Sequence, residues 1–134
     1  MAKVYVSDVQ TPNEIHAICG EAITQGDMVA IGSADGKFYK ANAITGATQQ
    51  APCVGIAEID GASGDMISAK RVGRVEGAAD LTPGQPVYLG ETDGAVTATE
   101  PSTSGDVVQV VGVAISATSF LLNVIDDYTT VTGG

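Results

Sequence analysis

The sequence predicts an all-β protein built from two copies of one small β unit. Residues 21–43 (EAITQGDMVAIGSADGKFYKANA) match residues 79–101 (ADLTPGQPVYLGETDGAVTATEP) at an offset of 58. Short alternating strands are separated by turn residues at the spacing typical of a barrel or sandwich, and no amphipathic helix of convincing length interrupts them. Nearly every shared position is a turn residue or an alternating apolar one: Thr24 and Thr82, Gly26 and Gly84, Val29 and Val87, Gly32 and Gly90, Asp35 and Asp93, Gly36 and Gly94. What is duplicated is therefore a backbone shape, which favours a scaffold or interaction protein.

The first copy shows the full order of elements. A turn at Gln25–Gly26–Asp27 precedes the strand MVAIG, and Asp35-Gly36 predicts a hairpin turn in which both central residues have positive φ. The return strand KFYKANA and the strand CVGIAEI follow, and MISAKRVGRVEG then predicts a last pair of strands, bent at Gly73.

The second copy repeats this order in fewer residues. VYLG, VTATE, the long strand VVQVVGVAIS and SFLLNVIDDY are its expected strands, and VGVA at 111–114 matches VGIA at 54–57. We therefore expect one compact β-barrel-like or β-tulip-like domain over 20–128, with halves of about 20–77 and 78–128. The small polar residues of 129–134 predict a flexible tail.

Residues 1–19 have no counterpart in the second half. KVYVSDV alternates, with Val4 and Val6 on one side and Tyr5 on the other, and EIHAIC resumes the alternation at Ile15. Two interpretations stay open. The segment is either an extended N-terminal arm that pairs with a neighbour, or an ordinary first strand of the same sheet.

The basic residues cluster where the halves diverge. Lys70, Arg71 and Arg74 make up three of the six positive charges of the chain. These side chains are either solvated or in weak surface pairs, or they meet an acidic patch on another subunit or protein. The candidate residues for capsid or subunit contact are Val4, Tyr5, Val6, Ile15, Lys70, Arg71 and Arg74.

Composition argues against several classes of protein. A net charge of −10 repels phosphate backbones and disfavours a nucleic-acid partner. No apolar run reaches the roughly 18 residues of a membrane span, and MAKVYVSDV lacks the apolar core of a signal peptide. Cys19 and Cys53 fit no metal spacing and are expected to be small buried thiols, since a disulfide is disfavoured in a protein made in the cytoplasm.

Catalytic patterns are missing from the sequence. The single histidine, His16, has no nucleophile-elbow motif in its segment, and on a strand it points away from Cys19. Asp60 and Asp65 flank a Gly-rich turn and are a weak candidate for a cation site, but turn formation explains each of them. We expect no enzyme activity, no cofactor and no bound metal.

The second half also resembles a known group of sequences. LTPGQPVYLGETDGAVTATEPSTSGDVVQVVGVAIS is similar to a segment of tailed-phage head-fibre, capsid-decoration and tail-fibre proteins, and ITQGDMVAIG with APCVGIAEI is similar to the capsid-decoration group. The resemblance implies a structural virion protein that binds the outer surface of a phage capsid as a homotrimer. It would be made in the host cytoplasm, have the major capsid protein as partner, and stabilise the shell as a decoration or cement protein.

A fibre module that binds a receptor or glycan is the alternative. Glycan sites commonly stack sugars on aromatic side chains. This chain has no tryptophan, and its four tyrosines are widely spaced. The decoration interpretation is therefore favoured.

Overall fold

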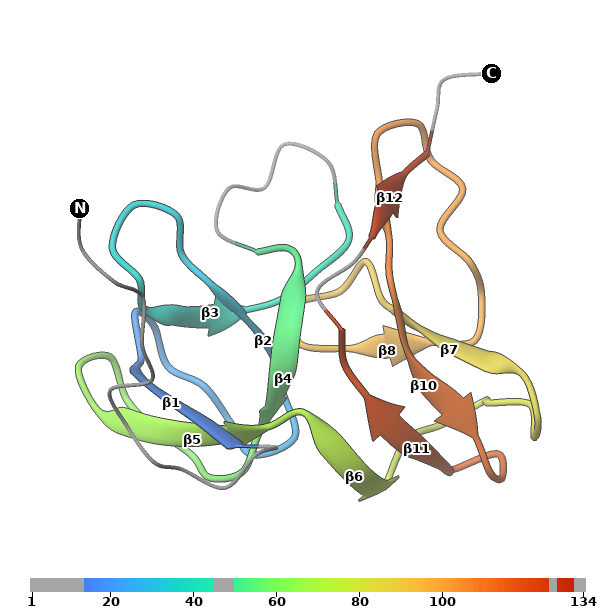
Figure 1. The fold of residues 1–134 in the computed structure, drawn as a ribbon, viewed down its shortest axis with the longest axis horizontal. Helices are drawn as coiled ribbons and strands as arrows, with labels where there is room; N and C mark the ends of the chain where they lie inside the picture. Colours follow the sequence, from blue (N-terminus) through green and yellow to red (C-terminus); the bar gives the residue numbers. More distant parts are fainter. Residues whose placement is uncertain (1–13, 45–49, 126–127, 132–134) are drawn as a thin grey trace, which may run out of the picture.

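The computed structural model describes residues 14–44, 50–125 and 128–131. This part of the chain forms two five-stranded antiparallel sheets and a two-stranded ribbon, without a helix (Figure 1). The predicted all-β class is confirmed. Neither five-stranded sheet closes on itself, because each has an edge strand at both ends of its strand order.

The two sheets have the same strand order. The first sheet runs β1-β5-β4-β2-β3 and the second β6-β11-β10-β7-β8. The strands of the first sheet are β1 (Glu14–Ile18), β2 (Met28–Ile31), β3 (Phe38–Lys40), β4 (Cys53–Ala57) and β5 (Met66–Lys70). Those of the second sheet are β6 (Val72–Glu76), β7 (Pro86–Leu89), β8 (Val96–Thr97), β10 (Val110–Ala114) and β11 (Ser119–Asn123).

The duplicated unit therefore has five strands, and it begins earlier than the sequence similarity does. β1 pairs with β5 from Glu14–Lys70 to Ile18–Met66, just as β6 pairs with β11 in the second sheet. The part of the expected N-terminal arm from Glu14 onward is thus the first strand of its own sheet, the second of the two interpretations above. Residues 1–13 lie outside the described residues.

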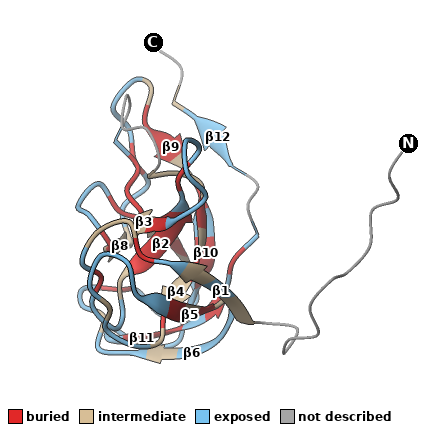
Figure 2. Cartoon of the chain, turned by 90° about the vertical axis from the view of Figure 1, so that its left-hand side faces the viewer, coloured by how far each residue is buried: buried red, intermediate tan, exposed pale blue. Residues whose placement is uncertain are grey.

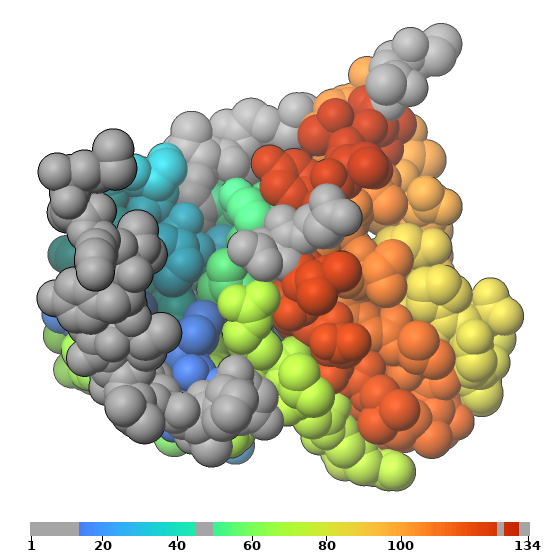
Figure 3. Space-filling view, in the orientation of Figure 1, coloured from blue at the N-terminus to red at the C-terminus, as the bar shows by residue number. Residues whose placement is uncertain are grey.

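The boundary between the halves also needs correction. The chain leaves β5 at Lys70, passes through Arg71 and enters the second sheet as β6, so the halves meet at Arg71 and not between residues 77 and 78. Arg71, not Gly73, separates the two strands of MISAKRVGRVEG. Figure 3 shows this green segment running between the blue first half and the yellow-to-red second half.

The conserved turn glycines have the backbone that the repeat predicts. Gly26 and Gly84 have φ of 94° and 81°, and Gly36 and Gly94 have φ of 72° and 75°. These values are accessible to glycine at little steric cost. The expected positive φ at both central hairpin residues was wrong, however, because the aspartate before each hairpin glycine keeps a negative φ. These hairpins turn through a left-handed glycine alone, as wider loops do.

Two apolar clusters stabilise the fold. The smaller one lies on one face of the first sheet and includes Cys19, Phe38 and Ile67. The larger one joins the opposite face of the first sheet, with Met28 and Ala30, to the second sheet. Its members from the second sheet include Val87, Leu89, Val111, Phe120 and Leu122. Cys19 and Cys53 are buried free thiols, as expected.

The expected long strand VVQVVGVAIS is divided at Gln109. β9 (Val107–Val108) ends before this residue, β10 begins after it, and the Gln109 side chain is fully buried. Its amide oxygen accepts the Cys53 N–H at 2.7 Å, and its Nε2 donates to the carbonyls of Cys53 at 2.8 Å and Ile125 at 3.0 Å. One side chain thus hydrogen-bonds the two halves across the larger core.

The C-terminal residues form a further short strand. β12 (Thr129–Thr130) pairs antiparallel with β9, so these two residues do not belong to the flexible tail that was expected. Figure 2 shows β12 as an exposed strand on the flank of the buried sheets. Residues 132–134 lie outside the described residues.

Candidate interaction surface

The side of the second sheet that faces away from the first sheet exposes apolar side chains. Val72, Val110, Val113 and Leu121 come from three adjacent strands, and they are 44–54% exposed. We call these four residues the outer face. Val113 and Leu121 are directly paired across β10 and β11 and line a shallow apolar hollow together with Val72. Contiguous exposed apolar surface of this kind marks an interaction site more often than isolated apolar residues do.

Strand alternation explains why these residues are exposed. Along β11, Phe120 and Leu122 point into the larger core while Leu121 points outward. Gly112 lies between the outward Val110 and Val113, where a Cβ would overlap the Leu121 carbonyl and lie 2.9 Å from the Phe120 ring. Glycine at this position therefore allows β10 and β11 to approach closely.

The predicted basic cluster does not form one free patch. Lys70 Nζ lies 3.5 Å from Glu14 Oε2 and 3.8 Å from Glu58 Oε2, and Arg71 donates to the Val124 carbonyl at 3.2 Å. The three basic side chains are thus distributed over two sheets and engaged within the chain. Arg74 hydrogen-bonds Glu76 and lines the hollow of the outer face, so it is the member of the cluster nearest to that surface.

The ion pairs at β1 perturb the pKa of Glu14. This pKa is held below its ordinary value by a hydrogen bond with Glu58 and by the positive charge of Lys70, against the opposing effect of desolvation. Ile15, the remaining described candidate, is half-buried against the smaller core, where it supports the fold. Val4, Tyr5 and Val6 lie outside the described residues.

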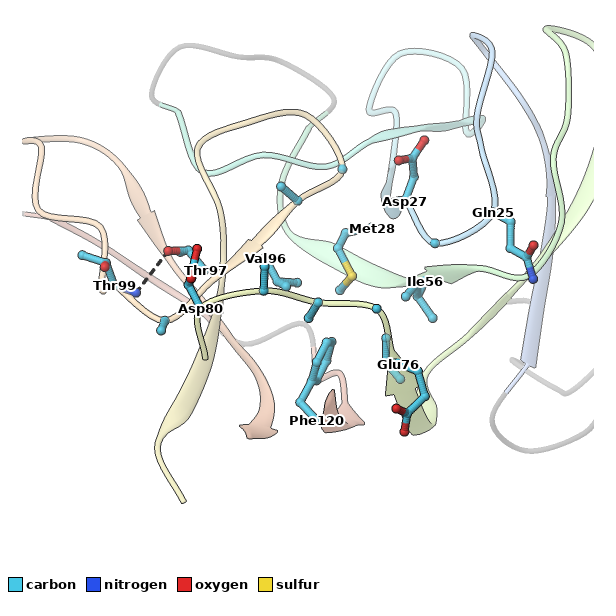
Figure 4. A pocket seen from close by; sticks show the side chains of 18 residues that line it. Gln25, Asp27, Met28, Ile56, Glu76, Asp80, Val96, Thr97, Thr99 and Phe120 are labelled. Carbon is cyan, nitrogen blue, oxygen red and sulfur yellow. Dashed lines mark hydrogen bonds between the residues drawn. The ribbon is translucent and has the colours of Figure 1, made fainter. Parts of the chain in front are cut away.

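A cavity of about 770 Å³ lies between the two halves. It is bounded by Gln25–Met28 from the first half and, in the second, by the segments 75–80 and 94–99. Figure 4 shows Met28, Ile56, Val96 and Phe120 around its centre, with Asp27, Glu76 and Asp80 toward the periphery. The lining contains these three carboxylates and no lysine, arginine or histidine.

Sequence reasoning did not find this cavity. Its walls come from segments that are distant in sequence, and they carry no shared motif. One signal was present: Asp80 is the non-glycine residue of positive φ in the described chain, at 60°, and it follows Gly77 at 91°. Such backbone is common in tight loops and is tolerated by Asp better than by most residues.

The potentially reactive groups do not form a catalytic arrangement in the described residues. Burial raises the pKa of the Cys53 thiol to about 12 and also raises the pKa of Cys19, so neither is an activated nucleophile. The Asp65 carboxylate accepts the Ala62 N–H within its own turn, and the Asp60 carboxylate accepts the N–H of Gln25 from a different turn. Among residues 14–44, 50–125 and 128–131, no group of three or more potential ligands is placed to hold a metal ion.

Nor does the described part of the chain include a helix with the length and apolarity needed to cross a membrane. The fold and its surfaces define a class: a small duplicated β module with an exposed apolar sheet face. Comparison with known proteins then gives the family, because the model of the phage cement proteins matches residues 9–120. The chain belongs to the phage cement protein family, a family of structural virion proteins. No curated protein matches the chain.

Proposed function

We propose that this protein binds the outer surface of a phage capsid as a homotrimer and stabilises the shell against disruption. Membership of the cement family supports a structural, capsid-associated role. The observation that carries the rest is the outer face, an apolar surface on a chain with a net charge of −10. A soluble acidic protein that leaves four apolar side chains together on one sheet is suited to association through that sheet.

The outer face supports the trimeric state. The equivalent face of the first sheet is covered by the second sheet within the same chain, so this side of the β unit is already used for packing once. In the trimer, the outer face packs against a neighbouring subunit, and Arg74 at its margin contributes a polar contact. Three copies also multiply modest contacts with a symmetric shell.

One contact is proposed for the candidate residues that precede β1. Val4, Tyr5 and Val6 lie in a segment whose alternation predicts an extended strand, and we propose that it pairs with the major capsid protein or with an adjacent subunit. β1 itself is an edge strand of the first sheet among the described strands. Synthesis in the host cytoplasm and final location on the capsid exterior follow from the same proposal.

Capsid binding is tested with shells that lack this protein. Purified protein is mixed with them and sedimented, and bound copies are counted by quantitative gel densitometry. We expect saturation at a fixed number of copies per shell and an increased temperature of capsid disruption. Protein that stays in the supernatant at all concentrations would contradict the proposal.

The trimer is tested by one substitution on the outer face. Leu121→Lys places a charge at a residue that is 54% exposed, and Met66→Lys makes the same kind of change at a strand residue that is 60% exposed but lies elsewhere. Light scattering should give a trimer mass for wild type and Met66→Lys and a monomer mass for Leu121→Lys. A monomeric wild type would rule out the trimer.

A further inference from the structure

The cavity between the halves is bordered by both edge strands of the second sheet. Among the described strands, β6 pairs with β11 alone and β8 with β7 alone, so both are edge strands of the second sheet. Val75 and Glu76 of β6 and Val96 and Thr97 of β8 all line the cavity. An exposed edge strand presents peptide groups that another extended chain can pair with.

Hydrogen bonding shows which way these peptide groups point. Leu89 pairs with Val96, but its N–H donates to the Gln109 carbonyl at 3.0 Å, on the side away from β8. In an antiparallel ladder this identifies a non-hydrogen-bonded pair, whose peptide groups point away from each other. Val96 therefore directs its N–H and C=O to the open side of β8.

The same alternation applies to β6. Val124 donates its N–H to the Arg71 carbonyl at 2.8 Å, and the register continues along the strand to Val75 opposite Phe120 and Glu76 opposite Ser119. Because the peptide groups of Arg71 point toward β11, those of every second residue up to Val75 do the same. The peptide groups of Glu76 therefore point away from β11. Both walls of the cavity offer unpaired strand backbone.

The side chains indicate what kind of segment fits. Met28, Ile56, Val96 and Phe120 give an apolar centre that suits small apolar side chains at alternate positions. The lining contains the carboxylates of Asp27, Glu76 and Asp80 and no basic residue. Arg74 offsets the charge of Glu76 from outside the lining, so the negative charge that remains comes from Asp27 and Asp80. A segment that carries lysine or arginine beside its apolar residues is complementary in charge.

We propose that this cavity receives an extended segment of the capsid surface by strand addition to β6 or β8, with apolar side chains inward and a basic side chain near the carboxylates of the lining. This inference rests on the proposed function, since it names the part of the shell that the protein holds. Main-chain hydrogen bonds supply affinity in this mode of recognition, and side-chain pockets supply specificity.

Two substitutions test the strand addition and the charge separately. Val96→Pro removes the outward N–H of β8 without removing a bond to β7, and Val96→Ile is its control, which keeps that N–H. Glu76→Lys reverses a charge on the lining whose ion-pair partner among the described residues is the exposed Arg74, and Glu100→Lys makes the same change outside the cavity. Binding to capsids that lack the protein is measured by co-sedimentation, and folding by thermal unfolding.

We expect Val96→Pro and Glu76→Lys to bind about tenfold more weakly, while both controls stay within about twofold of wild type. If wild type and all four variants bind equally, the cavity is not the contact, although the proposed function holds. If wild type itself does not bind, both proposals fail. Weakening by Glu76→Lys alone would overturn strand addition on β8. A melting temperature of Val96→Pro near that of wild type confirms that reduced binding is not unfolding.

Discussion

The two halves share one backbone and use it differently. In the first half, both faces of the sheet are covered, one by its own small core and the other by the second half. In the second half, one face packs on the first half and the other is the exposed outer face. At equivalent positions next to Gly55 and Gly112, the first half has Lys70 and the second has Leu121.

This difference shows how a duplicated unit acquires a new surface without a new fold. Lys70 is held between two carboxylates on the periphery of the first sheet, whereas Leu121 exposes an apolar side chain beside Val113. The side of the unit that packs within the chain in one copy is left open in the other. The halves have therefore diverged in what their side chains contact, while their strand order has stayed the same.

The largest effect is expected at Gln109 of the second half. The equivalent residue of the first half, 57 positions earlier, is Pro52. Gln109→Leu removes three hydrogen bonds and leaves buried peptide groups of Cys53 without partners. Since each such group costs about 1–3 kcal/mol, we expect a loss of about 3–5 kcal/mol in the free energy of unfolding. Urea denaturation measures it, with exposed Gln85→Leu as the control. A loss below about 1 kcal/mol would show that these three hydrogen bonds contribute little to holding the halves together.

The paired glycines give a direct comparison of strand packing in the two sheets. A Cβ at Gly112 would overlap the Leu121 carbonyl, whereas one at Gly55 would lie 2.8 Å from the Lys70 carbonyl. Both contacts involve backbone that cannot rotate away, so we expect Gly112→Ala to cost about 2–4 kcal/mol and Gly55→Ala about 1–2 kcal/mol. Thermal unfolding of both variants checks the order. The reverse order would mean that the second sheet relaxes more easily than the first.

A smaller effect is expected when Lys70 of the first half is replaced by leucine, the residue type at the equivalent position of the second half. Lys70→Leu removes two ion pairs, but the Lys70 side chain is 34% exposed and the pairs are screened by solvent. The loss should stay below about 1 kcal/mol and shrink further in high salt. Exposed Lys37→Leu, which has no ion pair in the described chain, is the matched control in urea denaturation. A loss of several kcal/mol would show that the ion pairs hold β1 in place.

The smallest effect is expected at Glu91 of the second half. The equivalent residue of the first half is Ser33. A hydrogen bond to the buried Asp106, followed by desolvation, raises the pKa of Glu91 above its ordinary value of 4.5. The stabilisation from the protonated carboxyl is complete below pH 4.5 and is lost as pH rises through the folded pKa. Glu91→Gln keeps a donor at every pH, so its melting temperature should exceed that of wild type near neutral pH and match it in acid. The substitution Glu100→Gln, at an exposed glutamate, is the matched control.

The turns and central strands were predictable because their backbone geometry and burial restrict which residues can occupy them. Gly26, Gly36, Gly84 and Gly94 need a backbone that few other residues adopt, and they therefore recur in both halves. β4 is apolar throughout because one of its faces packs on the larger cluster and the other on the smaller one. β10 packs on the larger cluster with one face and exposes Val110 and Val113 on the other.

The edge strands were harder to predict for the opposite reason. β1 and β6 are equivalent in structure, yet only one apolar match, Ile15 with Val75, falls on the same side of both. A strand with one unpaired side buries few residues, so its sequence drifts and the repeat cannot be seen. The cavity was missed for the same reason, since its walls are two such edges, and the outer face became visible only once β6 was assigned to the second sheet.

Pairing of the first and last strands within each half bears on how the duplication could arise. Glu14 lies opposite Lys70, and Val72 lies opposite Asn123, so the two ends of each unit are side by side. A unit with adjacent ends can be copied in tandem with almost no connecting peptide, and here Arg71 alone joins the copies. An in-frame tandem duplication of such a unit gives the repeated strand order without a long connecting peptide.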